Sequence, residues 1–191
     1  MSLYGENLKI KDALQIYFSE YHFKDGGYAD KYFKIKLWRL YIPVPNIKAR
    51  VDAVKIHDIH HLVTEYNALY KGEVEIGAWE IASGCGRYWV AWILNLSSFF
   101  IGILFYRRSL LKGFMDGRHA LTNLYSHSIY NDELLNRTVG ELRNEILPCS
   151  NSENSLMDYL HFTAWCILSV LYHLVLVAAT GYLANKIISH F

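Results

Sequence analysis

Histidine and carboxylate side chains gather in one short part of the chain, between His57 and Glu73. His57 and His61 are four residues apart, so on a helix both imidazoles project from one face about one turn apart. Asp58 follows His57 directly, so it can supply a third ligand or orient a histidine ring. Glu73 can meet the histidines if the chain folds back after them. The pattern predicts a divalent metal site made of His57, Asp58, His61 and Glu73.

Two nitrogen ligands with one or two oxygen ligands suit zinc in an open catalytic site, and they also suit iron or manganese. Zinc is the first choice, with iron, manganese and magnesium as alternatives. Glu80 lies two helical turns after Glu73, so it can act as a base or orient a ligand. Asp58 and Glu80 are therefore the candidate catalytic residues. His60 is expected at the margin of the site, and Glu75 is expected to face solvent.

Two consecutive helices must carry these residues. Apolar residues recur at helical intervals over 49–66, residues 67–72 form a short connection, and 73–81 begin a second helix. The two segments predict a helical hairpin with the metal site between its arms.

Further helices are expected around this hairpin, at 8–21 and 110–124, and a capping box at Thr138 and Glu141 predicts a short one before Pro148. Residues 32–41 alternate as in a strand but also have helical spacing, so their type stays open. The fold class is therefore all-α: a compact helical domain with a metal-binding hairpin.

Composition favours lipid over nucleic acid as a partner. The 191 residues have a net charge of +1 and only 19% charged side chains, which excludes a strong electrostatic pull toward nucleic acid. Hydrophobic residues make up 52% of the chain and aromatic residues 15%, as is common at membrane interfaces. Cys85, Cys149 and Cys166 form no CxxC pair, so we expect neither a disulfide framework nor a thiolate zinc site.

The segment 162–184 has no formally charged side chain over 23 residues, enough to cross a bilayer. We expect a transmembrane anchor there, with a buried core helix as the alternative because His173 lies near its middle. The predicted division is a domain over 1–148, a linker over 149–155 and an anchor over 156–191. Lys186 is alone among lysines and arginines in following the span, so the domain is expected to face the cytoplasm.

The string HDIHHLVTEYNALYKGEVEIGAWE, residues 57–80, resembles the family of the fourth coenzyme Q biosynthesis protein, the Coq-four family. The family pattern is His-Asp, two residues, His, eleven residues, Glu, and this sequence matches it at His57, Asp58, His61 and Glu73. A weaker likeness covers residues 10–148, through the Arg107-Arg108 pair, the segment 113–124 and the segment 138–143.

The resemblance implies an all-helical protein that binds a divalent metal, associates with membranes and holds an isoprenoid lipid. It implies a part in ubiquinone biosynthesis, on a prenylated head group at ring carbon 1. Whether the chain is an enzyme stays open between a metal-dependent decarboxylase or oxidative lyase and a scaffold that organises other quinone-biosynthesis enzymes. The expected location is the bacterial cytoplasmic membrane, or the matrix side of the mitochondrial inner membrane in a eukaryote. A homodimer is left open.

The apolar run 88–106 is long enough to cross a membrane, but doing so would place the later family-like helices opposite His57. We therefore expect a core or lipid-facing helix whose aromatic side chains line a groove for a prenyl tail. Two other metal-site classes fit less well. A His-Asp phosphohydrolase would need His22 and Asp116 at the site, and a desaturase would need further histidine boxes.

Overall fold

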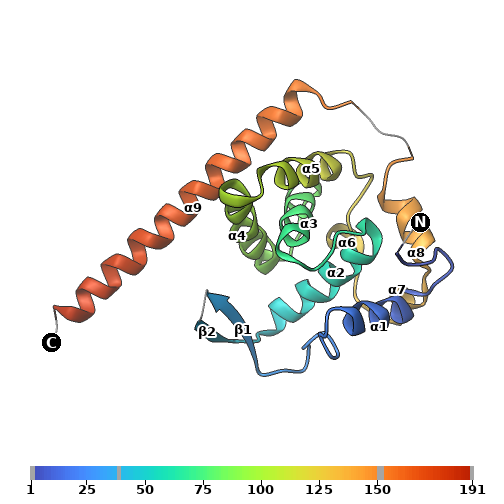
Figure 1. The fold of residues 1–191 in the computed structure, drawn as a ribbon, viewed down its shortest axis with the longest axis horizontal. Coiled ribbons are helices and arrows are strands. Elements are labelled where there is room, and N and C mark those ends of the chain that lie inside the picture. Colours follow the sequence, from blue (N-terminus) through green and yellow to red (C-terminus); the bar gives the residue numbers. More distant parts are fainter. Residues whose placement is uncertain (1–2, 38–39, 150–152, 190–191) are drawn as a thin grey trace.

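The computed structural model describes residues 3–37, 40–149 and 153–189, so residues 150–152 of the predicted linker lie outside the described part. The described chain is mainly helical, as predicted, with one two-stranded hairpin (Figure 1). In chain order the elements are α1 (Ile10–Glu20), β1 (Tyr32–Leu37), β2 (Leu40–Pro45), α2 (Lys48–Thr64), α3 (Tyr70–Ser83), α4 (Trp89–Phe105), α5 (Arg107–Arg118), α6 (Leu124–His127), α7 (Asp132–Asn136), α8 (Val139–Ile146) and α9 (Leu156–Ile188).

The stretch whose type the sequence left open forms the antiparallel hairpin of β1 and β2. Its register pairs Tyr32 with Pro45 and Leu37 with Leu40. Pro43 and Pro45 both lie in β2, which a two-stranded sheet tolerates because each strand has a free edge where a missing N–H interrupts no ladder.

The predicted helical hairpin is formed by α2 and α3. One face of α2 enters the core through Ile56, Ile59 and Leu62, none of which is exposed. α3 begins at Tyr70, three residues earlier than expected, so Glu73 falls in its first turn. A Cβ atom at Gly72 would lie 1.8 Å from the backbone oxygen of Asn67, so only glycine permits this tight connection.

On its other side, α3 packs so closely against α5 that the backbones of the two helices are in contact. Gly113 and Gly117 of α5 make this approach possible, since a Cβ at these positions would lie 2.1 Å from the oxygen of Glu75 and 2.4 Å from that of Trp79. α5 ends at Arg118, and the prediction that the helix reaches residue 124 is wrong. The chain leaves the helix there, and the N–H of Leu121 donates to the carbonyl of Ile146.

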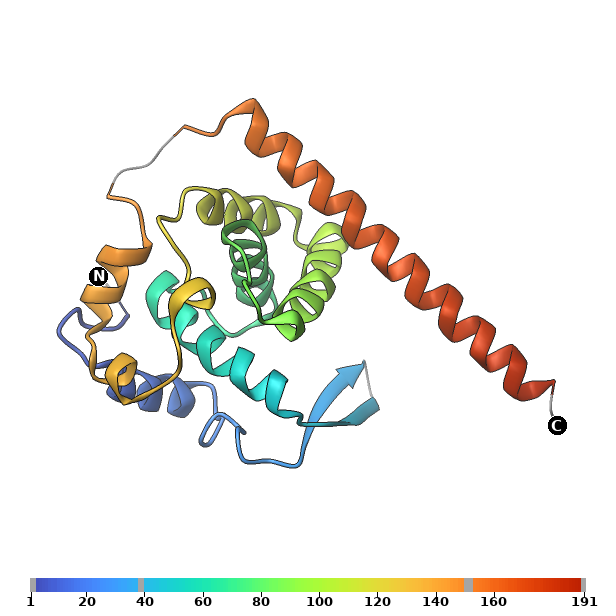
Figure 2. The same cartoon turned by 180° about the vertical axis from the view of Figure 1, so that it is seen from behind.

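α9 has a packed half and a free half. Its first half lies against α4, where Trp165 stacks on Trp92 at 5.5 Å and the Ser169 hydroxyl donates to the Leu96 carbonyl. Every described residue from Leu174 onward is exposed, and the helix leaves the domain (Figures 1 and 2). α9 is long and apolar enough to cross a membrane, with a mean hydropathy of 2.0 over its most apolar window, and it is not a buried core helix.

The contact between α3 and α5 predicts a loss of stability when Gly113 gains a side chain. Gly113→Ala forces the two backbones apart, and this exceeds the gain in helix propensity, for a net loss on the order of 1–2 kcal/mol. Urea denaturation measures the change, with Gly5→Ala as the control because nothing lies within 4 Å of a Cβ there. Equal losses in the two variants would contradict the proposed role of the close approach.

Candidate metal centre

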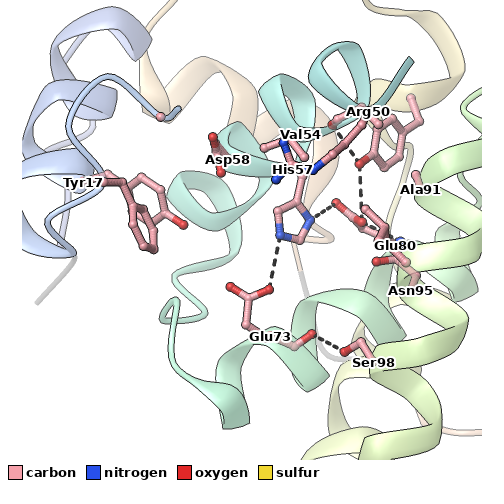
Figure 3. Close-up of a pocket in the computed structure, with 15 residues that line it drawn as sticks. Tyr17, Arg50, Val54, His57, Asp58, Glu73, Glu80, Ala91, Asn95 and Ser98 are labelled. Carbon is pink, nitrogen blue, oxygen red and sulfur yellow. Dashed lines mark hydrogen bonds and ion pairs between the residues drawn. The ribbon is translucent and has the colours of Figure 1, made fainter. Parts of the chain in front are cut away.

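Three side chains from α2 and α3 converge on one point. The Nε2 atoms of His57 and His61 lie 3.1 Å apart. The Glu73 carboxylate faces both, at 3.5 Å from His57 Nε2 and 3.4 Å from His61 Nε2. The helical spacing of the histidines and the early start of α3 produce this meeting, and Figure 3 shows Glu73 opposite the His57 ring. Among the described residues these three form the group that could hold a metal ion.

The other ring nitrogens fix how both histidines face this point. His57 Nδ1 donates to the Glu80 carboxylate at 3.0 Å, and His61 Nδ1 donates to the backbone oxygen of Tyr66 at 2.7 Å. Neutral imidazole carries one proton, so each Nε2 then presents a lone pair toward Glu73. Two lone pairs and a carboxylate at these distances repel one another unless a proton or a metal cation lies between them.

The separations fit a small divalent ion. Ligands about 2.0–2.1 Å from a tetrahedral zinc ion lie roughly 3.3–3.4 Å from one another. The three measured separations are 3.1, 3.4 and 3.5 Å. The side chain of Glu73 is 42% exposed, so the point where the three meet is open on one side. Three protein ligands with an open position are typical of a catalytic rather than a structural zinc site.

No protein-family model, curated protein or solved structure matches this chain. The family resemblance of residues 57–80 accordingly stays a prediction from the sequence. The candidate metal site does not depend on that resemblance, because it rests on the positions of three donor atoms and of the oxygens that accept from the two histidines.

Glu80 bonds the Nδ1 side of the His57 ring, whereas Glu73 faces Nε2, although both glutamates line the same cavity. Its carboxylate is completely buried and accepts from His57, from His60 at 2.7 Å and from the Asn95 amide at 2.6 Å. The Tyr125 hydroxyl lies 3.5 Å from the same carboxylate. Of the two roles predicted for Glu80, this geometry supports the one that orients a ligand, because Glu80 accepts from Nδ1 of His57 while the other ring nitrogen, Nε2, faces Glu73.

Asp58 is the member of the predicted ligand set that the structure does not bring into the group. Its carboxylate accepts a hydrogen bond from the Tyr28 hydroxyl at 2.5 Å and is buried. Burial raises the pKa of Asp58, while the neighbouring His57 and the Tyr28 hydrogen bond oppose that rise. Adjacent helical residues point about 100° apart, so Asp58 meets the tyrosine while His57 meets Glu73.

Several neighbouring residues differ from their expected positions. Glu75 is buried at 7% exposure, beside Lys71 at 3.8 Å, so the expectation that it faces solvent is wrong. His60, which was expected at the margin of the site, is fully buried, and its Nδ1 donates to the Glu80 carboxylate. A His-Asp phosphohydrolase would need Asp116 at the metal site. The Asp116 carboxylate accepts hydrogen bonds from the Tyr66 hydroxyl and the Lys112 amino group, so the structure does not support that arrangement.

A cavity of about 350 Å³ opens from the metal centre, within the size range of ligand pockets. Arg50, Val54 and His57 share the face of α2 that lines it (Figure 3). Arg50 is stacked over the Phe33 ring at 3.8 Å, and its Nε is buried without a hydrogen-bond partner. The candidate metal ligands His57 and Glu73 and the cation of Arg50 thus line one cavity, together with the carboxylates of Asp58 and Glu80 and the apolar side chains of Ala91 and Leu94.

The histidines and carboxylates of the candidate site shift one another's pKa values through their charges. Burial disfavours the charged form of His57, but Glu80 and Glu73 outweigh burial and raise its pKa well above the usual value. Burial likewise opposes ionisation of Glu73 and Glu80, yet the histidines lower the pKa of both carboxyl groups. Burial lowers the pKa of His60. The centre is therefore built for carboxylates that stay ionised beside a cation, either a proton on His57 or a metal ion.

Glu80→Gln is expected to weaken metal binding while leaving the three candidate ligands in place. The variant removes the charge that holds His57, and losing such a partner typically costs about 10–100-fold in metal affinity. Competition with a chromophoric chelator measures the zinc dissociation constant. Glu75→Gln is the matched control, a buried carboxylate on the same helix that does not touch the histidines. Unchanged affinity in Glu80→Gln would refute the orienting role.

The stabilisation by zinc is expected to grow with pH above 6.5. In the metal-free protein the raised pKa of His57 contributes stability that is complete below the ordinary value of 6.5 and is lost as pH rises through the folded-state pKa. Zinc replaces that proton, so the zinc-loaded protein keeps the interaction. Melting temperatures with zinc and with chelator should therefore diverge as pH rises. His61→Ala should abolish the divergence, and a constant difference in the unaltered chain would contradict this coupling.

Proposed function

We propose that this chain is a membrane-associated metal protein of isoprenoid quinone biosynthesis, acting on a prenylated aromatic head group at ring carbon 1. The observation that carries the proposal is the grouping of His57, His61 and Glu73 beside a cavity that Arg50 also lines. The sequence resemblance to the Coq-four family supplies the substrate class. The apolar helix α9 supports work at a membrane.

Each part of the cavity has a task in this proposal. His57 and His61, oriented by Glu80 and the Tyr66 carbonyl, present two nitrogens to the ion, and Glu73 adds an oxygen. Bound there, a divalent ion would act as a Lewis acid that stabilises negative charge on a head-group oxygen. Arg50 suits an acidic substituent on the ring, since its buried Nε has no partner in the protein.

The identity of the ion limits the reaction. Two nitrogens and one oxygen with an open side suit zinc best, and zinc would support the replacement of a ring carboxylate by a proton, which releases carbon dioxide without electron transfer. Oxidation at the same carbon requires a redox-active ion such as iron or manganese, which accept the same ligands, or a separate oxidant. Decarboxylation is therefore the step that these residues support most directly.

The alternative is a lipid-binding scaffold, in which the metal holds the head group and the chain gathers other quinone-biosynthesis enzymes at the cytoplasmic membrane. Both functions require the same cavity and the same lipid. The open three-ligand arrangement favours chemistry, because a purely structural zinc site usually has four protein ligands.

His61→Ala is expected to abolish quinone production in a host that depends on this protein. The variant removes one of the candidate metal ligands, so a carboxylated prenyl precursor should accumulate, as measured by lipid mass spectrometry. His127→Ala is the control, because His127 is exposed and pairs with Glu145 away from the centre. Normal quinone levels in His61→Ala would overturn the proposal. Loss of quinone without this precursor, accompanied by loss of bound partner enzymes, would instead favour the scaffold.

A further inference from the structure

α4 carries an apolar stripe that the described residues leave uncovered. Its members are 37–73% exposed and follow helical spacing along one side of the helix: Ile93, Leu94, Ile101, Leu104 and Phe105. The opposite side of α4 packs into the core through Phe99, which is not exposed at all. An apolar surface of this kind on a helix marks an interaction site.

The contacts between α9 and α4 show on which side of the domain the free half of α9 lies. Three contacts follow one another along α9: Phe162 with Phe99 at 5.9 Å between ring centres, Ser169 with the Leu96 carbonyl at 2.9 Å, and His173 stacked on Phe100 at 4.2 Å. With about 100° of rotation per residue, the contacted α4 positions progress around that helix from its core side toward the exposed stripe. The free half of α9 therefore leaves the domain on the side that the stripe faces.

The length of α9 indicates where lipid must begin. A bilayer core needs roughly 20 helical residues, and the 20 residues that end at Ile188 begin at Ser169, with Lys186 near enough to the helix end for its amino group to reach the lipid head groups. The exposed segment from Leu174 to Ile188 alone reaches only about 22 Å at 1.5 Å per residue. A crossing that uses the end of α9 thus includes the residues that lie against Leu96 and Phe100, and it brings α4 to the bilayer surface.

We propose that the α4 stripe and α9 from Ser169 onward form one bilayer-docking surface, with α4 lying at the interface of the near leaflet. The occupant is lipid rather than a second copy of the chain, because the free half of α9 exposes apolar side chains on all its sides. Leu174, Val175 and Val177 point in different directions from the helix axis and are 60%, 67% and 69% exposed. A single protein partner would cover one face, whereas a helix that is apolar all round suits a membrane.

This surface borders the metal cavity. Leu94 belongs to the stripe and also lines the cavity, on the same wall as Asn95 and Ser98. Lipid at the stripe would therefore lie beside the cavity's α4 wall, and an amphiphilic ligand could place its head in the cavity while its tail stays in the bilayer. The docking surface depends only on the fold, so it can hold even if the proposed quinone chemistry fails.

Site-specific fluorescence in reconstituted vesicles tests the docking surface. Ile101→Cys on α4 and Ile16→Cys on α1 are the matched pair, since these isoleucines are 40% and 49% exposed and α1 lies away from α9 in both views (Figures 1 and 2). The full chain, with Cys149→Ser and Cys166→Ala, is labelled with an environment-sensitive dye. It is then placed in phosphatidylcholine and phosphatidylglycerol vesicles with or without a nitroxide-labelled lipid.

The dye at position 101 should emit at shorter wavelength and be quenched several-fold more strongly than the dye at position 16. Val177→Cys provides the fully lipid-exposed reference. Equal, water-like emission at positions 101 and 16 would overturn the proposal. Shielding at 101 without nitroxide quenching, together with a dimer in detergent by light scattering, would also overturn it, because a second copy would then cover the stripe.

Discussion

The arrangement of the domain depends on the hydrogen bonds that surround the buried carboxylate of Glu80. An ionised carboxylate away from water is strongly destabilising unless hydrogen bonds and opposite charge compensate it. Here the compensation comes from three other helices: His57 and His60 on α2, Asn95 on α4 and Tyr125 on α6. These helices can pack only where their polar groups reach Glu80. One residue thereby links the position of the metal ligands to the position of the apolar helix α4.

α3 places Glu80 among these partners because the chain lies very close to it both at the connection from α2 and along α5. Gly72 permits the tight connection from α2, and Gly113 permits the approach of α5 at the back. Glu73 and Glu80 lie two turns apart on α3, so a fixed helix presents both carboxylates to the same face of α2. Glu73 then reaches the open side of the histidines and Glu80 their buried side. Glu73, which is partly exposed, can thus serve as a candidate ligand, whereas Glu80, which is buried, can orient a histidine.

Local geometry explains which parts of the site could be predicted. The pairing of His57 with His61 follows from helix periodicity alone, and the capping box of α8 is confirmed for the same reason. Asp58 was expected as a ligand because it is adjacent in sequence, yet it points toward Tyr28, which comes from a loop thirty residues away.

Contacts between distant segments could not be derived from spacing. Asn95 left a usable signal, since it is an amide within an otherwise apolar run, and such a side chain needs a buried partner. Tyr125 and Arg50 left none, because an isolated tyrosine or arginine has many ordinary surface roles. The strand type of residues 32–37 was likewise undecided until pairing with β2 was seen, since strand stability depends on the neighbouring strand.

The same limit applies to α9, which the sequence separates from the domain as an anchor. Its first half instead belongs to the packing of the domain, where Phe162, Trp165 and Cys166 lie against the cluster that contains Phe99 and Phe114. α9 is one continuous helix from Leu156 to Ile188, so its exposed half is rigidly continuous with the half that packs on α4. Since α4 also provides Asn95 to Glu80, a tilt of α9 would reach the buried side of the metal centre. The apolar helix α9 and the candidate metal ligands are thus linked by packing and hydrogen bonds through one intervening helix, α4.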